Sequence, residues 1–268
     1  MSIRVENLTF RYDGYDKDVL KNISFNVSDG EWISIVGHNG SGKSTLSRLL
    51  IGIEEPTKGY IYVNDQLLNE ESSYELRKHL GIIFQNPDNQ FVASTIEDDI
   101  AFGLENSLVP QEEMKERIIS ALESVKMSEF INSSPDELSG GQKQRAAIAG
   151  IIAIGPDTII FDESTSMLDP EGRDDVLNII KELHNNGRTI IMITHNMDEA
   201  SLSDRTIVLC DGEIIKDDTT FNVMNDLDTL KASRLEMPSE LYLYYLLKNK
   251  EYKNKEVLDA LWELASKK

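Results

Sequence analysis

Short apolar runs alternate with stretches of helical periodicity over the first 220 residues of the chain. Residues 2–10 and 23–27 mix apolar and polar side chains in the way that strands with one buried face do. Several later runs are continuously apolar, which is typical of parallel strands covered on both faces. Such strands are predicted at 31–36, 81–84, 158–161, 189–194 and 205–210. Because they alternate with helical segments, the pattern predicts an α/β fold with a mainly parallel sheet.

Helical patterns fill most of the remaining chain. Between residues 85 and 155 we predict helices at 112–126 and 140–154, and we expect a helical subdomain of about 86–154 inserted into the α/β core. A shorter helix follows the strand at 31–36, because apolar side chains recur there at spacings of three and four. These core-facing side chains are Leu46, Leu49, Leu50 and Ile53.

The strand pattern ends after Thr219, and two further apolar helical stretches follow at 241–247 and 257–265. We therefore divide the chain into a main domain at 1–222 and a C-terminal helical extension at 223–268. Its tail at 238–268 is too apolar on one face to remain solvated. It must pack on its own domain or on a partner protein.

The charge limits the kinds of partner. The chain has 268 residues with 27 Lys and Arg against 47 Asp and Glu, so 27 − 47 gives a net charge of −20. Proteins that coat nucleic acid or anionic lipid present basic faces, so neither is expected as a bulk partner.

The single cysteine, Cys210, excludes an internal disulfide and is expected to be a strand residue without chemistry. No signal region and no span of about 20 apolar residues is present, which predicts a soluble intracellular protein.

A glycine-rich motif lies between the strand at 31–36 and the helix after it. It fits G-x-x-x-x-G-K-[ST] in full, with the residues Gly37, His38, Asn39, Gly40, Ser41, Gly42, Lys43 and Ser44. Glycines let successive backbone N–H groups turn around a phosphate, and the helix adds its positive N-terminal end. Lys43 would reach the β and γ phosphates, and the Ser44 hydroxyl would bind Mg²⁺. The alternative, a glycine-rich turn that binds nothing, is disfavoured by the flanking strand and helix.

Two carboxylates end the apolar strand that begins at Thr158. Asp162 is placed to hold Mg²⁺, because this hard cation prefers oxygen ligands. Glu163 follows directly, and its side chain would point toward an attacking water that it could activate as a general base. Taken alone, such a pair is a solvated strand end. With the phosphate loop in the same chain, the catalytic interpretation is favoured.

A second glycine-rich helix start occurs in Leu138, Ser139, Gly140, Gly141 and Gln142. Ser139 is a natural N-cap, and the two glycines leave the first backbone N–H groups uncovered. This is either an ordinary helix start or a second anion site. Glycine weakens a helix, so the pair favours close approach of a ligand to the backbone.

In this order, the motifs resemble those of the ATP-binding-cassette (ABC) ATPases over roughly Ser2 to Thr220. The resemblance implies a P-loop NTPase core with a mainly parallel sheet, an N-terminal antiparallel β part and the inserted helical subdomain. It implies ATP and Mg²⁺ as ligands, with Thr45 beside the phosphate loop. Further implied roles are Tyr12 stacking on adenine, Gln85 at Mg²⁺ or the water, Asp169 coupling two sites and His195 at the γ-phosphate. For Tyr12 a surface aromatic, and for His195 a structural histidine, are the alternatives.

In this family two cassettes meet head to tail, and each ATP lies between one phosphate loop and the partner's Ser139–Gly141 segment. The chain has one copy of each motif, so the resemblance implies a second ABC ATPase subunit. A paralogous partner is favoured, and a second copy of this chain is the alternative. The extension at 223–268 is expected at this dimer contact by analogy.

The segment at 84–106, FQNPDNQFVASTIEDDIAFGLEN, is similar to the A-components of energy-coupling-factor (ECF) transporters. These importers take up vitamins or transition-metal ions through a transmembrane T-component and a substrate-binding S-component. The resemblance implies a peripheral protein on the cytoplasmic face of the membrane, with the region after Gln85 contacting the T-component. Glu97, Asp98 and Asp99 either pair with arginines of that partner or cap the local helix. Both roles are compatible.

The leading hypothesis is thus the motor ATPase of an ECF importer. The alternatives are an ATPase of another ABC transporter, a soluble ABC ATPase of DNA repair or translation, or a regulatory module without turnover. Long coiled-coil insertions and fused cassettes, usual in the soluble class, do not fit in 268 residues. The intact Glu163 argues against the regulatory module. The transported solute does not follow from the sequence.

Overall fold

Two sheets form the centre of the protein, and the computed structural model describes residues 2–250 and 254–266. The larger sheet has five parallel strands and one antiparallel edge strand, β10. In spatial order its strands are β10 (Glu213–Thr219), β9 (Arg205–Cys210), β3 (Trp32–Val36), β8 (Thr189–Thr194), β7 (Thr158–Asp162) and β6 (Leu80–Ile83). The mainly parallel sheet predicted from the apolar runs is confirmed.

The smaller sheet is antiparallel and comes from the N-terminal part of the chain. Its strands, in spatial order, are β2 (Leu20–Val27), β1 (Ile3–Phe10), β4 (Lys58–Val63) and β5 (Gln66–Leu67). The predicted N-terminal antiparallel β part is therefore present. Strand β2 begins three residues before the predicted 23–27, because Leu20 is buried opposite Phe10.

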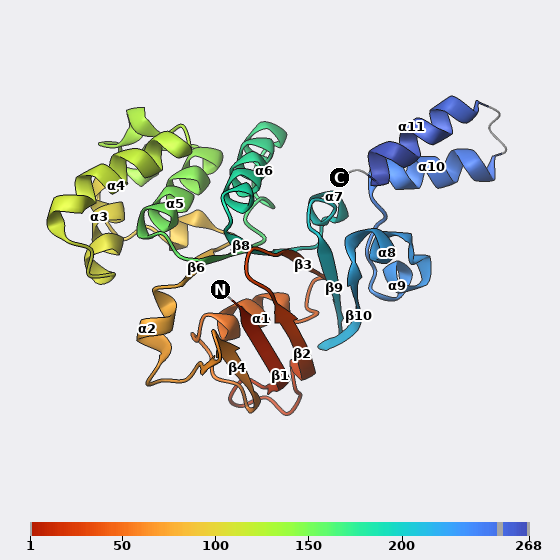
Figure 1. Ribbon diagram of the computed structural model, residues 1–268, viewed down its shortest axis with the longest axis horizontal. Helices are drawn as coiled ribbons and strands as arrows, with labels where there is room; N and C mark the ends of the chain where they lie inside the picture. The colour runs from red at the N-terminus through yellow and green to blue at the C-terminus, as the bar shows by residue number, and fades with distance from the viewer. Residues whose placement is uncertain (1, 251–253, 267–268) are drawn as a thin grey trace.

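The helices lie around the two sheets (Figure 1). In chain order they are α1 (Lys43–Leu50), α2 (Ser73–Arg77), α3 (Ile96–Asn106), α4 (Gln111–Ser124), α5 (Gly140–Ile154), α6 (Pro170–Asn185), α7 (Met197–Ala200), α8 (Thr220–Asn225), α9 (Leu227–Ala232), α10 (Ser239–Asn249) and α11 (Lys255–Ser266), with 3₁₀ turns η1 (Pro87–Asn89), η2 (Ser128–Phe130) and η3 (Pro135–Glu137). Figure 1 shows α3, α4 and α5 together at one end of the molecule and α10 and α11 at the other.

The continuous apolar strands bury both faces of the large sheet. Ile33 and Ile35 of β3 pack into a core shared with α1 and the small sheet. Ile190 and Met192 of β8 lie in a second core with α3 to α6. Successive side chains of a strand point to opposite faces, so a strand between two cores must be apolar at every position. Packing between these cores fixes the strand ends at which the functional motifs lie.

The predicted stripe on α1 is correct for three of its four side chains. Leu46, Leu49 and Leu50 are fully buried. Ile53 is 53% exposed, so its assignment to the core is wrong. Helix α1 ends at Leu50, and Gly52 then takes a left-handed φ of 67°, which turns the chain away before Ile53.

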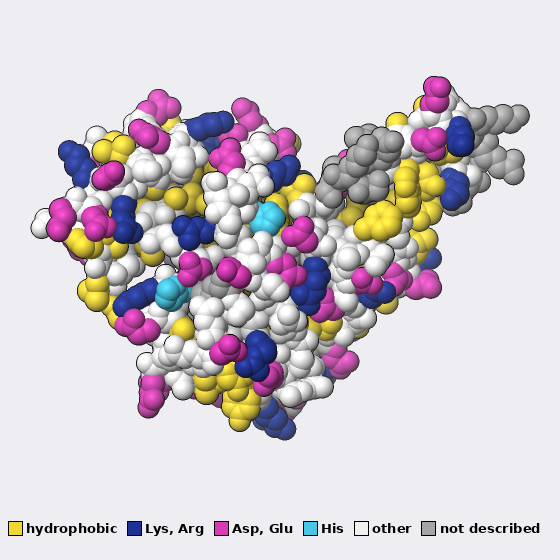
Figure 2. Space-filling model, viewed as in Figure 1, with side chains coloured by type: hydrophobic (Ala, Val, Ile, Leu, Met, Phe, Trp, Pro, Cys, Tyr) yellow, Lys and Arg dark blue, Asp and Glu magenta, His cyan; other side chains and the backbone are white. Residues whose placement is uncertain are grey.

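The C-terminal extension is anchored on its own domain. Leu241 of α10 is 2% exposed and belongs to a third core with residues of α7, α8 and β9. The backbone N–H of Ser239, the first residue of α10, donates to Asp198 Oδ1 at 3.1 Å. Tyr242 and Leu243 are 58% and 41% exposed, and hydrophobic side chains gather on this arm in Figure 2. The predicted extension also includes 251–253 and 267–268, which lie outside the described residues.

Candidate functional site

The phosphate loop connects the end of β3 to α1 and closes tightly against β9. A Cβ on Gly37 would lie 2.1 Å from the Leu209 carbonyl oxygen, so no side chain fits there. Gly42 has a φ of 107°, which L side chains rarely adopt. The Lys43 ammonium is buried in this loop and donates to the Gly37 and His38 carbonyl oxygens at 2.9 and 3.2 Å. Backbone N–H groups and one buried cation are thus gathered at the N-terminus of α1, as anion binding requires.

Asp162 lies at the end of β7, directly beside the start of α1. The Ser44 hydroxyl donates to Asp162 Oδ1 at 3.2 Å, and the Ser47 hydroxyl donates to Asp162 Oδ2 at 2.7 Å. Burial raises the pKa of Asp162 above its usual range, and Glu163 acts in the same direction. Hydrogen bonds from Ser47 and Ser44, together with the charge of Lys43, act to lower this pKa. The oxygen donors of Asp162 and Ser44 suit Mg²⁺, which would compensate the buried carboxylate charge.

The sequence patterns did not identify Ser47 as a partner of Asp162. It lies one turn after Ser44 on α1, so both hydroxyls face β7. A polar residue within the apolar stripe of α1 was the available signal.

Replacing Asp162 by Asn should stabilise the nucleotide-free protein at pH 7. When the pKa of a carboxyl group is raised in the folded state, ionisation of that group lowers the free energy of unfolding. We expect thermal unfolding to shift upward by about 2–4 °C. The difference from the wild type should shrink as the pH falls toward the unfolded-state pKa of Asp, about 3.9, where Asp162 becomes neutral. Scanning calorimetry without Mg²⁺ checks this, with the exposed Asp65→Asn as the matched control. An unfolding midpoint below that of the wild type at pH 7 would contradict it.

Glu163 follows β7 and has a left-handed φ of 50°. Its backbone N–H donates to the Ile193 carbonyl oxygen at 2.8 Å, which fixes the turn against β8. The carboxylate oxygens lie 3.4 Å from Lys43 Nζ, 3.5 Å from His195 Nδ1 and 3.4 Å from Gln85 Nε2, which donates. Four predicted residues from three strand ends and one loop therefore converge on one point.

Three of these residues, Lys43, Gln85 and Glu163, border a single cavity of about 360 Å³. Its walls include Gly40, Lys43 and Ser44 of the phosphate loop, together with Gln85 and Glu163. Gln85 is also held by the Ser166 hydroxyl, whose oxygen accepts from Gln85 Nε2 at 3.1 Å. A buried ammonium, a carboxylate and a helix N-terminus around one cavity can bind a polyphosphate and place a water beside a base.

A buried carboxylate connects the segments that carry Glu163 and His195, and the sequence patterns did not indicate it. Glu199 of α7 is 4% exposed and accepts hydrogen bonds from the Thr165 and Thr194 hydroxyls, both at 2.7 Å. Arg173 of α6 pairs with the same carboxylate at 3.0 Å. Thr165 follows Glu163 by two residues, and Thr194 directly precedes His195. Glu199 therefore fixes the position of both segments.

Tyr12 lies beside the phosphate loop but is engaged within the protein. Its hydroxyl is 3.1 Å from Thr45 Oγ1, and its ring meets Phe10 edge-on at 4.8 Å between centroids. The ring is partly buried, and Tyr15, 68% exposed, packs edge-on against it. The structure thus places Tyr12 against Thr45 of α1, and adenine stacking remains a prediction.

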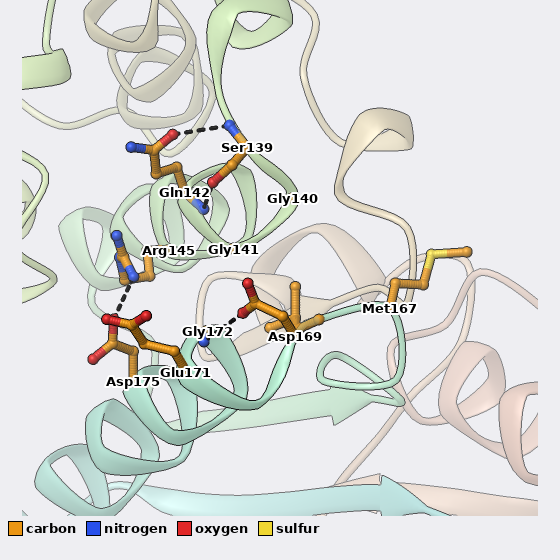
Figure 3. Close-up of a pocket in the computed structure, with 11 residues that line it drawn as sticks. Ser139, Gly140, Gly141, Gln142, Arg145, Met167, Asp169, Glu171, Gly172 and Asp175 are labelled. Carbon is orange, nitrogen blue, oxygen red and sulfur yellow. Dashed lines mark hydrogen bonds and ion pairs between the residues drawn. The ribbon is translucent and has the colours of Figure 1, made fainter.

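The signature segment borders a different cavity, of about 510 Å³ (Figure 3). Ser139 caps α5, and the capping is reciprocal: Gln142 N donates to Ser139 Oγ at 3.3 Å, while Ser139 N donates to Gln142 Oε1 at 2.8 Å. Gly140 and Gly141 lie open on this cavity, and Leu138 is buried beneath. Asp169 lines the same cavity and caps α6 by accepting from Gly172 N at 2.8 Å. Among the residues that the structure describes, none lines both cavities, so the phosphate loop and the signature segment face separate cavities.

Comparison with known proteins agrees with this geometry. The ABC transporter family profile matches residues 20–166, which contain the phosphate loop, the signature and both carboxylates. The chain belongs to the ABC transporter family. This ABC protein is 46% identical to the energy-coupling factor transporter ATP-binding protein EcfA1 of Ligilactobacillus salivarius (strain UCC118), over 99% of this chain and 97% of that protein. It is also 46% identical to EcfA1 of Streptococcus mutans serotype c, over 99% and 98% of the two chains.

Solved structures agree as well. The ABC protein resembles cbiO1 of Clostridium perfringens, described as part of the ABC transporter complex cbiONQ, with a TM-score of 0.77 and 32% identity over 91% of this chain and 98% of that one. A dimeric ATP-binding cassette in a post-hydrolysis state, bound to ADP and Pi, gives a TM-score of 0.73 and 29% identity over 81% and 98%. The predicted P-loop ABC fold, the ATPase class and the resemblance to ECF A-components are thereby confirmed, and the protein is an ATP-binding transporter subunit.

Proposed function

We propose that this chain is the ATP-hydrolysing motor subunit of an energy-coupling-factor importer, driving uptake of a vitamin or transition-metal ion. Relatives that match it over nearly their full length are named as ATP-binding proteins of such transporters. The observation that carries the proposal is the pair of unconnected half-sites, one around Lys43 and Glu163 and one around Ser139 and Asp169. A single chain cannot place both around one ATP.

The two half-sites imply a head-to-tail pair of cassettes. The signature around Ser139 would close on the γ-phosphate held by the partner's phosphate loop, and Asp169 would couple the two sites. We favour a paralogous partner over a second copy. The number in the name EcfA1, carried by several curated relatives, supports a paired set of subunits.

The chemistry follows from the residues around the first cavity. Lys43 would move from the carbonyl oxygens of its own loop to the β and γ phosphates. Mg²⁺, held by Ser44, Asp162 and Gln85, would supply positive charge at the phosphates when bound. Glu163 would accept a proton from the attacking water, with its carboxylate oriented by the three side chains around it.

His195 and the backbone N–H groups complete the phosphate site. His195, which is half exposed, would contact the γ-phosphate as it leaves. The backbone N–H groups of His38, Asn39, Gly40, Ser41 and Gly42 would hold the remaining phosphate oxygens. Tyr12 and Thr45 would bind the nucleoside end.

The membrane partner is expected on the helical subdomain at 86–154. A cavity of about 330 Å³ lies there between α3 and α5, with Phe91, Val92, Phe102 and Ile151 among its walls. Val92 and Phe102 are 68% and 49% exposed. Apolar side chains open to solvent in a groove favour a protein partner.

In the part of the chain that the structure describes, no helix is both long and apolar enough to cross a bilayer. We therefore propose peripheral attachment through a T-component, with an S-component in the same complex, at the cytoplasmic face.

The acidic residues at the start of α3 serve the local fold. Asp98 Oδ2 accepts from Thr95 Oγ1 at 2.7 Å, and Asp99 Oδ1 accepts from Val92 N at 2.7 Å. The N-cap of α3 is Thr95, whose Oγ1 accepts from Asp98 N at 3.1 Å, so these two carboxylates hold the segment before the helix instead of capping it as predicted. Because Asp99 also orders the Val92 segment, it shapes the proposed docking groove.

Replacing Phe102 by Ala should weaken capture of the membrane subunits by about tenfold or more, since it removes a large exposed aromatic from the groove. The matched control is Tyr60→Ala on β4, because Tyr60 is similarly exposed at 55% but lies on the small sheet. Capture through a tag on this chain from detergent-solubilised native membranes, quantified by mass spectrometry, measures the effect. Equal recovery of membrane subunits with both variants would refute the proposed contact.

We further propose that 1–222 forms the ABC domain and that 223–268 contributes to the dimer contact. The anchored Leu241 and the outward Tyr242 and Leu243 support this arrangement, because α10 is fixed at one face and leaves an apolar face uncovered.

A further inference from the structure

Three side chains with metal-binding atoms meet next to the phosphate loop but outside the catalytic cavity. His38 comes from that loop, Cys210 is the last residue of β9, and Asp211 begins the turn between β9 and β10. One ligand atom of each lies within 4.8 Å of the other two. Gly37 is packed so tightly on the Leu209 carbonyl that the loop and the turn are held in fixed relation. The three ligands are therefore brought together by the fold itself.

The hydrogen bonding of the His38 ring determines which of its nitrogens faces the Asp211 carboxylate. His38 Nδ1 is 2.9 Å from the Asn39 carbonyl oxygen, which can only accept, so Nδ1 carries a proton. In the neutral ring, Nε2 then presents a lone pair to Asp211 Oδ1, only 3.3 Å away. Either a proton on Nε2 or a cation bound between the two atoms matches this contact, and both use the same pair of facing atoms. Backbone binding at one ring nitrogen with a ligand at the other is also the usual arrangement of metal-binding histidines.

The separation and the donor types fit a borderline transition-metal cation. Tetrahedral Zn²⁺, with Zn–N and Zn–O bonds of about 2.0–2.2 Å, places N and O ligands about 3.3–3.6 Å apart. The observed distance between His38 Nε2 and Asp211 Oδ1 is 3.3 Å. Cys210 Sγ is 4.0 Å from Asp211 Oδ2 and also donates to the Ala232 carbonyl oxygen at 3.6 Å, so binding a metal requires the thiol to give up that carbonyl. A set of nitrogen, sulfur and oxygen suits Zn²⁺ or Co²⁺ and does not suit Mg²⁺.

We propose that His38, Cys210 and Asp211 form a binding site for a Zn²⁺-type cation, with the fourth position left to water. Asp211 is 77% exposed and gives the ion a path from solvent. The nearby cation Lys21 donates to the Asp211 carbonyl oxygen at 2.7 Å and pairs with Glu213 at 3.8 Å, so its charge is already balanced. An occupied site joins the phosphate loop to the β9–β10 turn. No chemistry is predicted for Cys210 from the sequence, because the end of β9 lies beside His38 only in the folded chain.

Cobalt titration of the full-length, tag-free, nucleotide-free protein tests the site. The chain has one cysteine, so any thiolate-to-cobalt charge-transfer absorption must come from Cys210. We expect this absorption with one equivalent of Co²⁺ in the wild type and in the control Asp65→Asn. Asp65 is the matched control because it also lies in a strand-connecting turn with a left-handed φ. The absorption should be absent in Cys210→Ser.

Zinc affinity, measured by competition with a chromogenic chelator, gives the second readout. Asp211→Asn keeps a side chain that tolerates the φ of 48° and should weaken Zn²⁺ binding about 10- to 100-fold. Cys210→Ser should weaken it at least as much, and Asp65→Asn should leave it unchanged. Absence of the charge-transfer band in the wild type, or equal zinc affinity in the wild type and Cys210→Ser, would overturn the proposal.

Discussion

Replacing Glu163 by Gln lowers steady-state ATP turnover about 10²- to 10⁴-fold, the usual contribution of a positioned general base. Gln keeps the shape of the side chain, tolerates its place in the turn and cannot accept the proton. The amide still faces Lys43 and His195, so ATP binds with an affinity close to that of the wild type. Phosphate release by the purified complex and equilibrium binding of a fluorescent ATP analogue measure the two quantities separately.

The same variant should trap the cassettes in a closed pair, because the γ-phosphate that both half-sites hold is no longer cleaved. Size-exclusion chromatography with ATP and Mg²⁺ detects this accumulation. Glu182→Gln provides the control, since Glu182 is an exposed glutamate of α6 away from the cavity. Near-normal hydrolysis by Glu163→Gln would show that another group is the base.

Replacing Lys43 by Ala should weaken ATP binding by about 2–3 kcal/mol, or about 30- to 150-fold, the scale of a lost hydrogen bond to a charged group. The buried ammonium is the cation nearest to Glu163 in the cavity, at 3.4 Å. Its removal leaves the phosphates facing that carboxylate without compensation. Isothermal titration calorimetry with ATP and Mg²⁺ measures the loss.

Lys58→Ala controls for the loss of one positive charge, because Lys58 is exposed on β4. A thermal unfolding scan of Lys43→Ala confirms that the variant is folded before binding is compared. ATP affinity unchanged from that of the wild type would be incompatible with the assigned phosphate loop.

Local patterns predicted the elements well where burial is uniform. Helix α5 (Gly140–Ile154) and strands β8 (Thr189–Thr194) and β9 (Arg205–Cys210) begin and end as predicted. Each of these strands is buried, so its apolar run coincides with its length. Ile53 was assigned to the core wrongly because hydrophobic periodicity does not show that α1 ends at Leu50. The left-handed Gly52 then turns the chain away before Ile53.

The site was predicted where motif spacing encodes it and missed where only folding creates it. Glu163 and His195 are 32 positions apart in sequence, and family motifs placed them together. Glu199 has no such motif, and its bonds to Thr165 and Thr194 depend on how α7 packs behind β8. The same holds for the contact between Ser47 and Asp162. Long-range polar pairs of this kind leave only a weak signal in one sequence, a polar residue at a buried position.

The central claim, an ATP-hydrolysing subunit of a membrane importer, is tested most directly by isolating the native complex. We would capture the wild-type chain through a small tag from solubilised membranes of its own host and determine both composition and ATPase activity. The account predicts a second ABC subunit, at least one integral membrane protein and hydrolysis of ATP by the captured complex. Recovery with ribosomes or DNA-bound proteins, and without an integral membrane protein, would contradict it.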